Sequence, residues 1–588
     1  MTTLPPPIQD SIPLVPPPQV PPPPSLSSST TSTSVRPDAH TQKYDRQLRL
    51  WASSGQTLLE TCKILVINSN STSSSILKNL VLPGIGQFTI LDDQLVTEKD
   101  LGTNFFLNKE SLGKSRSEES VKFLKELNSD VKGNSINSNL ENFLNSSSEQ
   151  ALKEYNLVLA VDVVPPFKLN QLSEKAWEFG IPLISVNSFG FYGSLTTQIE
   201  EITLVETHPE SLIDLRLNQP FKELIEFSTG PGNEFDYDRL DSAELSHVPA
   251  VVILIKALEN WKSSHEGKGP EGSKDRKEFL EEYVLNPGKR QGSDDENFQE
   301  AVGLFRRAGN KKPIPEEIEK LFKDDSCQNL TSQSSNFWIL LHTLKLFTQK
   351  SEGLLPLTGS LPDMKSHSQT YIKLQKVYRE KALTDLKLFN KLLIQVLDSL
   401  NDQDKKGREI ISKEEIESFV KHSGWLKVLR GRKLNDMINH SEKSLLKGKI
   451  NELLEQASWS SPPDQSLSIY LSIQTCWKFY EKHSRYPGSL NSKQGDLDGT
   501  LDHSEMLQLG KELLKELDYN GDELPESFSN SIKELCRSSH STLPQTSALL
   551  GGLVAQESIK LITKQYVPLV GETCIWDGIT SMTGRVKA

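Results

Sequence analysis

The sequence has few cysteines, and none of them is spaced to bind a metal. Its 588 residues include five cysteines, which lie far apart and form no C-x-x-C pair. This spacing excludes a cysteine-based zinc site and a disulfide framework, and it is typical of a protein in a reducing compartment. They are Cys62, Cys327, Cys476, Cys536 and Cys574.

Long hydrophobic runs and an excess of basic charge are absent as well. No run of eighteen or more apolar residues occurs, so we expect no membrane-spanning helix. The first residues have neither the basic start nor the apolar centre of a signal peptide, and we expect a cytoplasmic and nuclear protein. A net charge of −12 argues against binding to nucleic acid and favours protein partners.

Glycine is missing from one turn where it would be most informative. Residues 63–68 predict a buried strand, residues 76–82 a helix and residues 88–93 a second strand, which together form a βαβ unit. In nucleotide-binding units the first turn carries glycines, which adopt positive φ and let backbone amides approach phosphate. Here the turn, residues 68–73, reads Asn-Ser-Asn-Ser-Thr-Ser. The scaffold therefore lacks a phosphate cradle, which favours the structural or regulatory half of a larger enzyme.

Composition and periodicity divide the chain into four parts. Residues 1–39 are rich in Pro, Ser and Thr and are predicted to be disordered. Alternating strands and helices in residues 40–208 predict an α/β fold, whereas residues 209–535 read as a mostly α region. Residues 536–588 are expected to complete the α/β part. The predicted fold class is thus a Rossmann-like fold with a parallel-rich sheet, interrupted by a large helical insertion.

Further elements follow from the same patterns. In the first part we expect helices at 44–51 and 115–127, strands at 156–161 and 181–186, and antiparallel strands within 193–205. In the insertion we expect long helices at 250–261, 337–347, 368–400, 413–428 and 466–483. A helix at 546–563 contains Gly551 and Gly552 and should pack closely on a neighbour before a strand at 572–576.

Several strings resemble the adenylation domains of ubiquitin-like-modifier activating enzymes. These are Lys43–Trp51, Leu82–Gly86 and Gly551–Lys560. Others are similar to the regulatory subunit of the neddylation-activating enzyme, the amyloid-precursor-protein-binding protein family, namely Asn104–Leu107, Gly359–Met364, Tyr371–Gln375 and Val377–Lys381. The resemblance covers nearly everything after the tail. It implies an adenylation fold that pairs with a catalytic subunit, which holds ATP, magnesium and the reactive cysteine.

The departures from active members agree with the inactive half of such a pair. Thr103 replaces a phosphate-binding arginine, and Arg116 falls where active members have lysine. Val163 falls where they have a magnesium-binding aspartate, although a shift of one residue would place Asp162 there. Asp92 remains where an acid would hold a ribose, but alone it is better read as a polar residue at a strand end. None of the cysteines precedes a threonine, as the family's nucleophile does. The resemblance thus implies no catalytic residue, cofactor or metal in this chain.

The resemblance also implies contacts with the catalytic subunit. Arg46 matches the arginine that reaches across to the γ-phosphate of ATP on the partner; the alternative is a surface arginine paired with Asp45. The subunit interface is expected to include His247, Asp363, Met364, Tyr371, Lys373 and Lys376. The alternatives are a helix core for Tyr371 and a purely structural role for His247.

The expected function is that of a regulatory subunit, which supports ATP-dependent adenylation and thioester transfer of the neddylation modifier by a catalytic subunit. Three alternatives stay open at this point. The chain could be an interaction scaffold, a regulatory subunit for a different ubiquitin-like modifier such as that of sumoylation, or an active nucleotide enzyme with an unusual loop. ATP binding by the isolated chain would favour the last of these.

Overall fold

A computed structural model describes most of the chain after the proline-rich tail. The described residues are 37–146, 151–163, 167–207, 214–232, 234–289, 294–308, 313–400, 410–438, 444–489 and 500–588. The predicted disordered segment, residues 1–39, lies almost entirely outside them. Residues 1–46 and 47–588 form two separate units, and the fold described below is that of the second.

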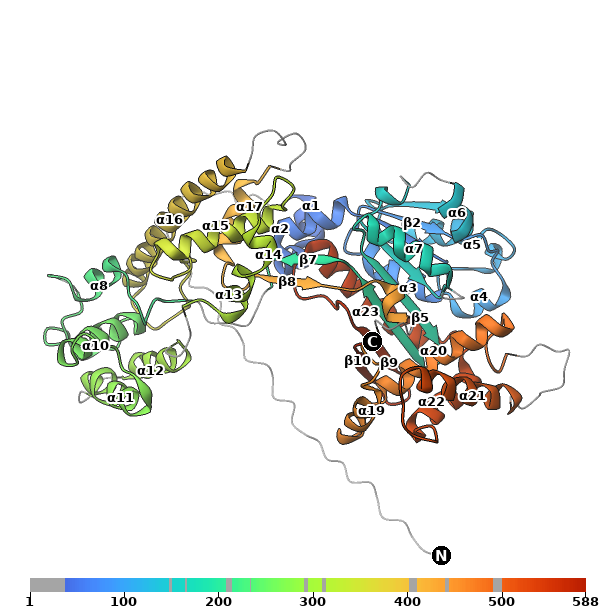
Figure 1. Cartoon of the computed structure of the whole chain (residues 1–588). Helices are drawn as coiled ribbons and strands as arrows, with labels where there is room; N and C mark the ends of the chain where they lie inside the picture. Colours follow the sequence, from blue (N-terminus) through green and yellow to red (C-terminus); the bar gives the residue numbers. More distant parts are fainter. Residues whose placement is uncertain are drawn as a thin grey trace, which may run out of the picture. The chain divides into compact units, whose positions relative to one another are not determined.

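A mixed eight-stranded sheet organises the α/β part, with the strand order β10-β9-β6-β5-β4-β1-β2-β3 (Figure 1). Its strands are β1 (Lys63–Ile67), β2 (Gln87–Leu91), β3 (Lys132–Ile136), β4 (Leu157–Val161), β5 (Leu183–Phe189), β6 (Tyr192–Gln198), β9 (Thr573–Asp577) and β10 (Met582–Val586). Strands β1 to β5 pair in parallel, whereas β6, β9 and β10 extend the sheet in antiparallel fashion. The predicted α/β class with a parallel-rich sheet is confirmed.

Strand β1 shows why the sheet is covered on both faces. Ile64 and Val66 join one hydrophobic cluster, and Leu65 and Ile67 join another on the opposite face. Successive side chains of a strand point to opposite faces, so a continuous apolar run needs helices on both sides. The helices of this part are α2 (Asp45–Thr61), α3 (Ser71–Val81), α4 (Glu98–Thr103), α5 (Arg116–Lys125), α6 (Leu140–Ser146), α7 (Phe167–Glu178) and α23 (Pro544–Thr563). The short elements of this part are η1 (Lys109–Ser111) and η2 (Leu152–Glu154), whereas helix α1 (Ala39–Lys43) belongs to the first unit.

Helix α2 is longer than the predicted helix at 44–51. It continues to Thr61, but Trp51 and Ala52 have non-helical backbone angles, with φ of −127° and 55°. The predicted end at Trp51 therefore coincides with a kink, and the helical segment that follows it was missed.

The predicted insertion contains mainly helices, which Figure 1 shows from α8 to α22. They are α8 (Lys222–Thr229), α9 (Ser242–Leu245), α10 (Ala250–Ser264), α11 (Gly272–Glu278), α12 (Glu296–Ala308), α13 (Glu316–Phe322), α14 (Asp325–Gln328), α15 (Asn336–Lys350), α16 (Ser368–Ser399), α17 (Lys413–Lys421), α18 (Leu434–Ile438), α19 (Ile450–Trp459), α20 (Ser466–His483), α21 (Thr500–Glu516) and α22 (Glu526–Ser538). A π-helix, η3 (Phe279–Leu285), and a short 3-10 turn, η4 (Asn286–Gly288), follow α11.

One predicted helix, 413–428, is wrong in its second half. Helix α17 ends at Lys421, and residues 427–430 form strand β8 (Lys427–Arg430) instead. Strand β8 pairs in antiparallel fashion with β7 (Glu201–Leu204) in a separate two-stranded sheet. Gly424 lies between the helix and the strand, where a helix is readily interrupted. The strand depends on a partner more than two hundred residues earlier, which local periodicity cannot reveal.

The last helices before the C-terminal segment share a core with the sheet. The cluster that contains α20 and α22 also contains Phe189 and Tyr192 of the β5–β6 hairpin, and Ile575 and Val586 of β9 and β10. Leu434 and Met437 of α18 join the cluster on one face of the sheet, and most of the other helices form two clusters of their own. The domain boundaries given from the sequence stay a prediction. Within the described residues, no helix has both the length and the apolar character needed to cross a bilayer.

Helix α23 packs closely on α3, as its glycine pair predicted. A Cβ atom at Gly551 would lie 2.6 Å from the Cβ of Ser75 and 2.8 Å from its carbonyl carbon. At Gly552, one position later in the same helix, an added Cβ meets nothing within 4 Å. Gly551 therefore sets the distance between two helices that cover the sheet.

Replacing Gly551 with Ala is expected to lower the free energy of unfolding by about 1–3 kcal/mol, because the contact is with backbone that cannot move aside. The matched change Gly552→Ala should instead stabilise the protein by about 0.5–1 kcal/mol, since alanine favours a helix over glycine. Urea unfolding followed by circular dichroism measures both. Equal effects of the two substitutions would contradict the close packing.

Candidate functional site

The turn between β1 and α3 contains no glycine, yet it begins with a residue of positive φ. Asn68 has a positive φ of 71°, a conformation that asparagine tolerates better than most residues. Its side-chain Nδ2 donates to the carbonyl oxygens of Val161, at 2.8 Å, and of Asp162, at 3.2 Å. The turn therefore forms because it is tied to the end of β4.

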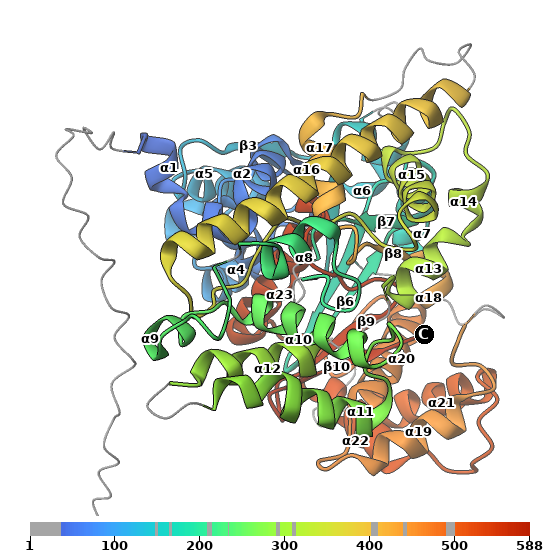
Figure 2. The ribbon, with the colours of Figure 1, turned by 90° about the vertical axis from the view of Figure 1, so that its left-hand side faces the viewer.

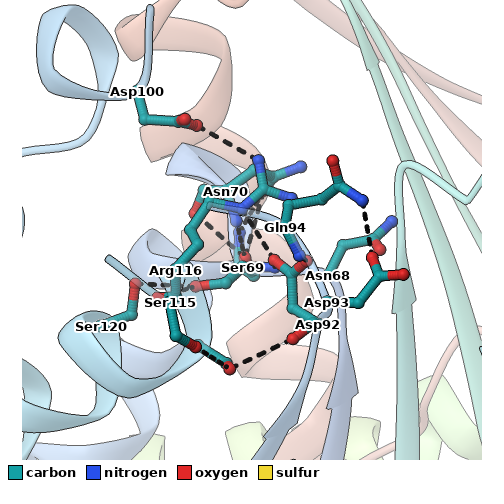
Figure 3. Close-up of polar contacts among 12 residues, drawn as sticks. Asn68, Ser69, Asn70, Asp92, Asp93, Gln94, Asp100, Ser115, Arg116 and Ser120 are labelled. Carbon is teal, nitrogen blue, oxygen red and sulfur yellow. Dashed lines mark hydrogen bonds and ion pairs between the residues drawn. The ribbon is translucent and has the colours of Figure 1, made fainter. Parts of the chain in front are cut away.

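The backbone amides of this turn are already bonded to the chain's own oxygens (Figure 3). The amide of Ser69 donates to Asp92 Oδ2 at 2.8 Å, and that of Asn70 donates to Ser73 Oγ at 2.7 Å. The amide of Ser73 donates to Asn70 Oδ1 at 2.9 Å, which completes a capping box at the start of α3. Such amides bind phosphate in nucleotide sites. Here a phosphate would have to displace three internal hydrogen bonds.

Arg116 is held between two carboxylates next to the turn (Figure 3). Its Nε lies 2.7 Å from Asp92 Oδ2, and its Nη1 lies 3.3 Å from Asp100 Oδ1. The Asp92 side chain is 1% exposed, and its Oδ1 also accepts from the amide of Gln94 at 2.9 Å. The guanidinium is thus neutralised, and Asp92 has both oxygens engaged. These contacts agree with the reading of Asp92 as a polar residue at the end of a strand.

A cavity of about 640 Å³ opens at this edge of the sheet. Carboxylates outnumber basic side chains around it, and Tyr480 and Tyr486 of the helical region also line it. The acids are Asp92, Asp93, Asp100, Glu141 and Asp162, and the bases are Lys99, Arg116 and Lys168. A triphosphate carries several negative charges, which this lining would repel. The excess of carboxylates in this lining therefore disfavours a triphosphate.

Thr103 replaces the long cation that the resemblance leads one to expect in this cavity. It ends helix α4, and its hydroxyl donates to the carbonyl of Lys99 at 3.1 Å, within its own helix. The Nζ of Lys99 in turn donates to the carbonyl of His540 at 2.9 Å. The segment therefore presents no guanidinium at the position of Thr103.

Asp162 brings a carboxylate to the carboxyl end of β4, whereas Val163 is buried in a hydrophobic cluster. Asp162 Oδ1 accepts from the amide of Ser188 at 2.6 Å, and Oδ2 accepts from Ser188 Oγ at 2.9 Å and Asn70 Nδ2 at 2.7 Å. Burial raises its pKa to about 6, although these hydrogen bonds act in the opposite direction. The shifted matching, with Asp162 at the metal-binding position, agrees with this placement, but the carboxylate is engaged by three donors.

Arg46 lies near the start of helix α2, and its side chain is exposed. An exposed guanidinium can donate two parallel hydrogen bonds to phosphate. This position is compatible with the expected contact in trans, which stays a prediction.

The residues expected at the subunit interface divide into buried and exposed ones. Met364 is buried in the core of the helical region, and Tyr371 is half-buried against that core. The Tyr371 hydroxyl donates to the carbonyls of Leu361 and Pro362, each at 3.3 Å. Asp363, Lys373 and Lys376 are exposed; Lys373 pairs with Glu234, and Lys376 lies 3.8 Å from Glu380. The core role weighed for Tyr371 agrees with its contacts, and the interface assignment of the set stays a prediction.

His247 stacks on His367, which sequence reasoning did not anticipate. The two rings are nearly parallel, with centroids 4.3 Å apart and an interplanar angle of 10°. His247 Nδ1 lies 2.8 Å from the carbonyl of Ala243. His367 immediately precedes α16, so the stack joins the start of that helix to the α9 turn. No sequence signal relates two histidines so far apart.

The cysteines are poorly suited to nucleophilic chemistry. Burial raises the pKa of Cys62 and of Cys536 to about 12 and that of Cys327 to about 11. Burial likewise raises the pKa of Cys476 and of Cys574. The reactive form of cysteine is the thiolate, which is scarce at neutral pH for such groups. In the described part of the chain, no three His, Cys, Asp or Glu side chains are grouped to hold a metal ion.

The raised pKa of Asp162 predicts a pH dependence of stability. Its folded pKa of about 6 exceeds that of the unfolded chain, so its stabilising contribution is complete below pH 4 and is lost as pH rises to 6. Asp162→Asn removes this titration. The difference in unfolding free energy, wild type minus variant, should therefore fall by about 2–3 kcal/mol between pH 4 and pH 7. Urea unfolding at several pH values measures it, and a constant difference would contradict the assignment.

Comparisons with known proteins agree with the resemblance seen in the sequence. Residues 44–588 match the ThiF family. The "NEDD8-activating enzyme E1 regulatory subunit" of Danio rerio is 36% identical over 532 residues, which are 90% of this chain and 95% of that protein. The Gallus gallus protein of the same name is 35% identical over 94% of this chain and 99% of its own length. The "NEDD8-activating enzyme E1 regulatory subunit AXR1" of Arabidopsis thaliana is 33% identical over 94% and 97%. The chain therefore belongs to the ThiF family and, within it, to the regulatory subunits of the NEDD8-activating enzyme E1.

Proposed function

We propose that this chain is the non-catalytic half of a heterodimeric activating enzyme of protein neddylation. It pairs with a catalytic subunit that holds ATP, magnesium and the reactive cysteine, and together they adenylate the modifier NEDD8 and transfer it to a thioester. The proposal includes a location in cytoplasm and nucleus. The observation that carries the non-catalytic role is the ion pair between Arg116 and Asp92. By the sequence resemblance, these two residues fall where active members have a lysine and a ribose-binding acid.

The engaged amides of the first turn support the same role. An adenylating enzyme must bind a triphosphate and stabilise the charge that develops as pyrophosphate leaves. At the first turn the amides of Ser69, Asn70 and Ser73 are bonded internally, and the lining of the adjoining cavity is rich in carboxylates. Binding of ATP would cost these bonds and place like charges together. The work of adenylation is therefore assigned to the partner's site.

The chain's contribution to the reaction is positioning and one cation. Arg46 is assigned the contact in trans with the γ-phosphate of ATP on the catalytic subunit, where a permanent positive charge favours departure of pyrophosphate. The residues assigned to the subunit interface are His247, Asp363, Met364, Tyr371, Lys373 and Lys376. Met364 and Tyr371 would support this surface from the hydrophobic cluster beneath it. The names of the relatives favour a role in the activation of NEDD8 over a role as an interaction scaffold or in the activation of another modifier.

The role of Arg46 is tested by ATP–pyrophosphate exchange with NEDD8. The catalytic subunit is assayed alone, with this chain, and with its Arg46→Ala form. Exchange should require this chain and should fall by at least about tenfold with Arg46→Ala, because a transition-state contact is lost. Arg49→Ala, on the same helix and of the same charge, is the control for a mere loss of charge. If the catalytic subunit works equally well alone, the regulatory assignment fails and the scaffold takes its place.

The absence of a working nucleotide site is tested on the isolated chain. Titration with a fluorescent ATP analogue and magnesium should give no saturable signal at millimolar concentrations, because the amides and Arg116 are already engaged. The heterodimer serves as the positive control. Saturable binding to the isolated chain, lost in Arg116→Ala, would favour an active nucleotide enzyme with an unusual loop.

A further inference from the structure

A groove lies between two helical segments of the hydrophobic cluster that includes α8, α10 and α12. These segments are far in sequence from the cavity at the edge of the sheet. One wall is α11 together with the π-helix η3, and the other is α12; Figure 2 shows α11 and α12 next to each other. The groove has a volume of about 410 Å³. Its lining residues are Ser273, Arg276, Lys277, Leu280, Glu281, Leu285, Val302, Phe305 and Arg306.

The groove has an apolar floor and a basic rim. Leu280, Val302 and Phe305 form the floor and are at most 9% exposed. Lys277 and Arg306 stand exposed on opposite walls, and Glu281 is the one acid among the lining residues. The whole chain carries a net charge of −12. A local excess of positive charge on an acidic protein selects for an acidic ligand.

The rim cations keep most of their capacity for an external partner. Lys277 Nζ lies 3.9 Å from Glu281 Oε1, and both side chains are more than half exposed, so the attraction between them is weak. Arg306 has no ion-pair partner among the residues that the structure describes. Carboxylates brought to both walls would therefore meet cations that internal pairs do not satisfy.

The wall formed by η3 is held rigidly in an uncommon conformation. Residues Phe279–Leu285 form a π-helix, a rare form that is often found at functional sites. Aromatic rings of neighbouring helices pack against it: the ring centroids of Phe279 and Phe305 are 4.8 Å apart, and those of Tyr283 and Trp261 are 5.1 Å apart. The rings of His265 and Trp261 are stacked, with centroids 3.7 Å apart. The groove is thus formed in advance, which lowers the entropic cost of binding.

We infer that this groove binds an acidic amphipathic helix of a partner protein. Its walls are helices, and its lining follows helical spacing. Arg276 lies four residues before Leu280 on one wall, and Val302 lies four residues before Arg306 on the other. An amphipathic helix places apolar side chains at similar intervals, which fit the floor, while flanking carboxylates reach the two rims. This binding site is separate from the proposed support of adenylation, and none of its residues is assigned to the subunit interface.

The test uses the full chain and a fluorescein-labelled synthetic helix of about 15 residues, with leucines at i, i+4 and i+7 and glutamates on the flanks. Binding is followed by fluorescence anisotropy. Lys277→Glu and Arg306→Glu should each weaken binding about fivefold, and together at least about tenfold, because rim charges face the glutamates. The matched control is Lys274→Glu, an exposed residue of α11 that does not line the groove, which should change binding less than about twofold.

A scrambled peptide of identical composition separates a helix-shaped site from simple charge attraction, and it should bind at least about tenfold more weakly. The double variant should still support ATP–pyrophosphate exchange, since it lies outside the proposed machinery. Equal binding of the scrambled peptide, or an equal effect of Lys274→Glu, would overturn the inference. Binding to phosphatidylserine vesicles that is lost in the double variant, without binding of the peptide, would replace the helix with a membrane surface.

Discussion

The carboxylate of Asp92 holds together the edge of the sheet at which a nucleotide site would stand. It directly follows strand β2, accepts a hydrogen bond from the first turn at Ser69, and pairs with Arg116 at the start of α5. A buried carboxylate is costly unless each oxygen is engaged, and here both are. The turn, the strand end and the helix start therefore depend on one another. The loss of one contact would deprive the buried Asp92 carboxylate of one of its donors.

Under the proposed non-catalytic role, this dependence explains how a nucleotide-binding frame persists without nucleotide chemistry. In an active site, amides and cations are left unsatisfied until the ligand binds, which reduces the stability of the empty protein. Here the same positions are satisfied internally, by Asn70 at the helix start and by the acids around Arg116. The frame gains stability from the groups that would otherwise bind phosphate. Such a subunit can then serve as a rigid platform for a partner.

The sequence predicts well what depends on neighbouring residues. The strands β1 and β2, the long helices α16 and α20, and the close contact at Gly551 all follow from local periodicity or residue size. Of the site, the missing glycines and the substitutions at Thr103 and Arg116 could be seen in the sequence with the help of the family resemblance.

The rest could not be predicted, because it depends on contacts between distant segments. The positive φ of Asn68 is stabilised by carbonyls at the end of β4, 93 and 94 residues later. Arg116 meets Asp92 across 24 residues. Strand β8 exists because β7 pairs with it, and the histidine stack joins two separate helices. The π-helix η3 is held by rings from α10 and α12, which no local pattern records.

The pairing of β9 with β6 has a consequence for the order of folding. Thr573 lies beside Thr196, 377 residues away in sequence, so this pair closes one of the longest loops of the chain. Contacts between residues so far apart in sequence form slowly, whereas the helices between the two strands can associate with elements that are nearer in sequence. Until β9 arrives, the edge of β6 presents unpaired amides and carbonyls to any other strand. Newly made chains are therefore most vulnerable to aggregation at the edge of this sheet, after the helical region has already condensed.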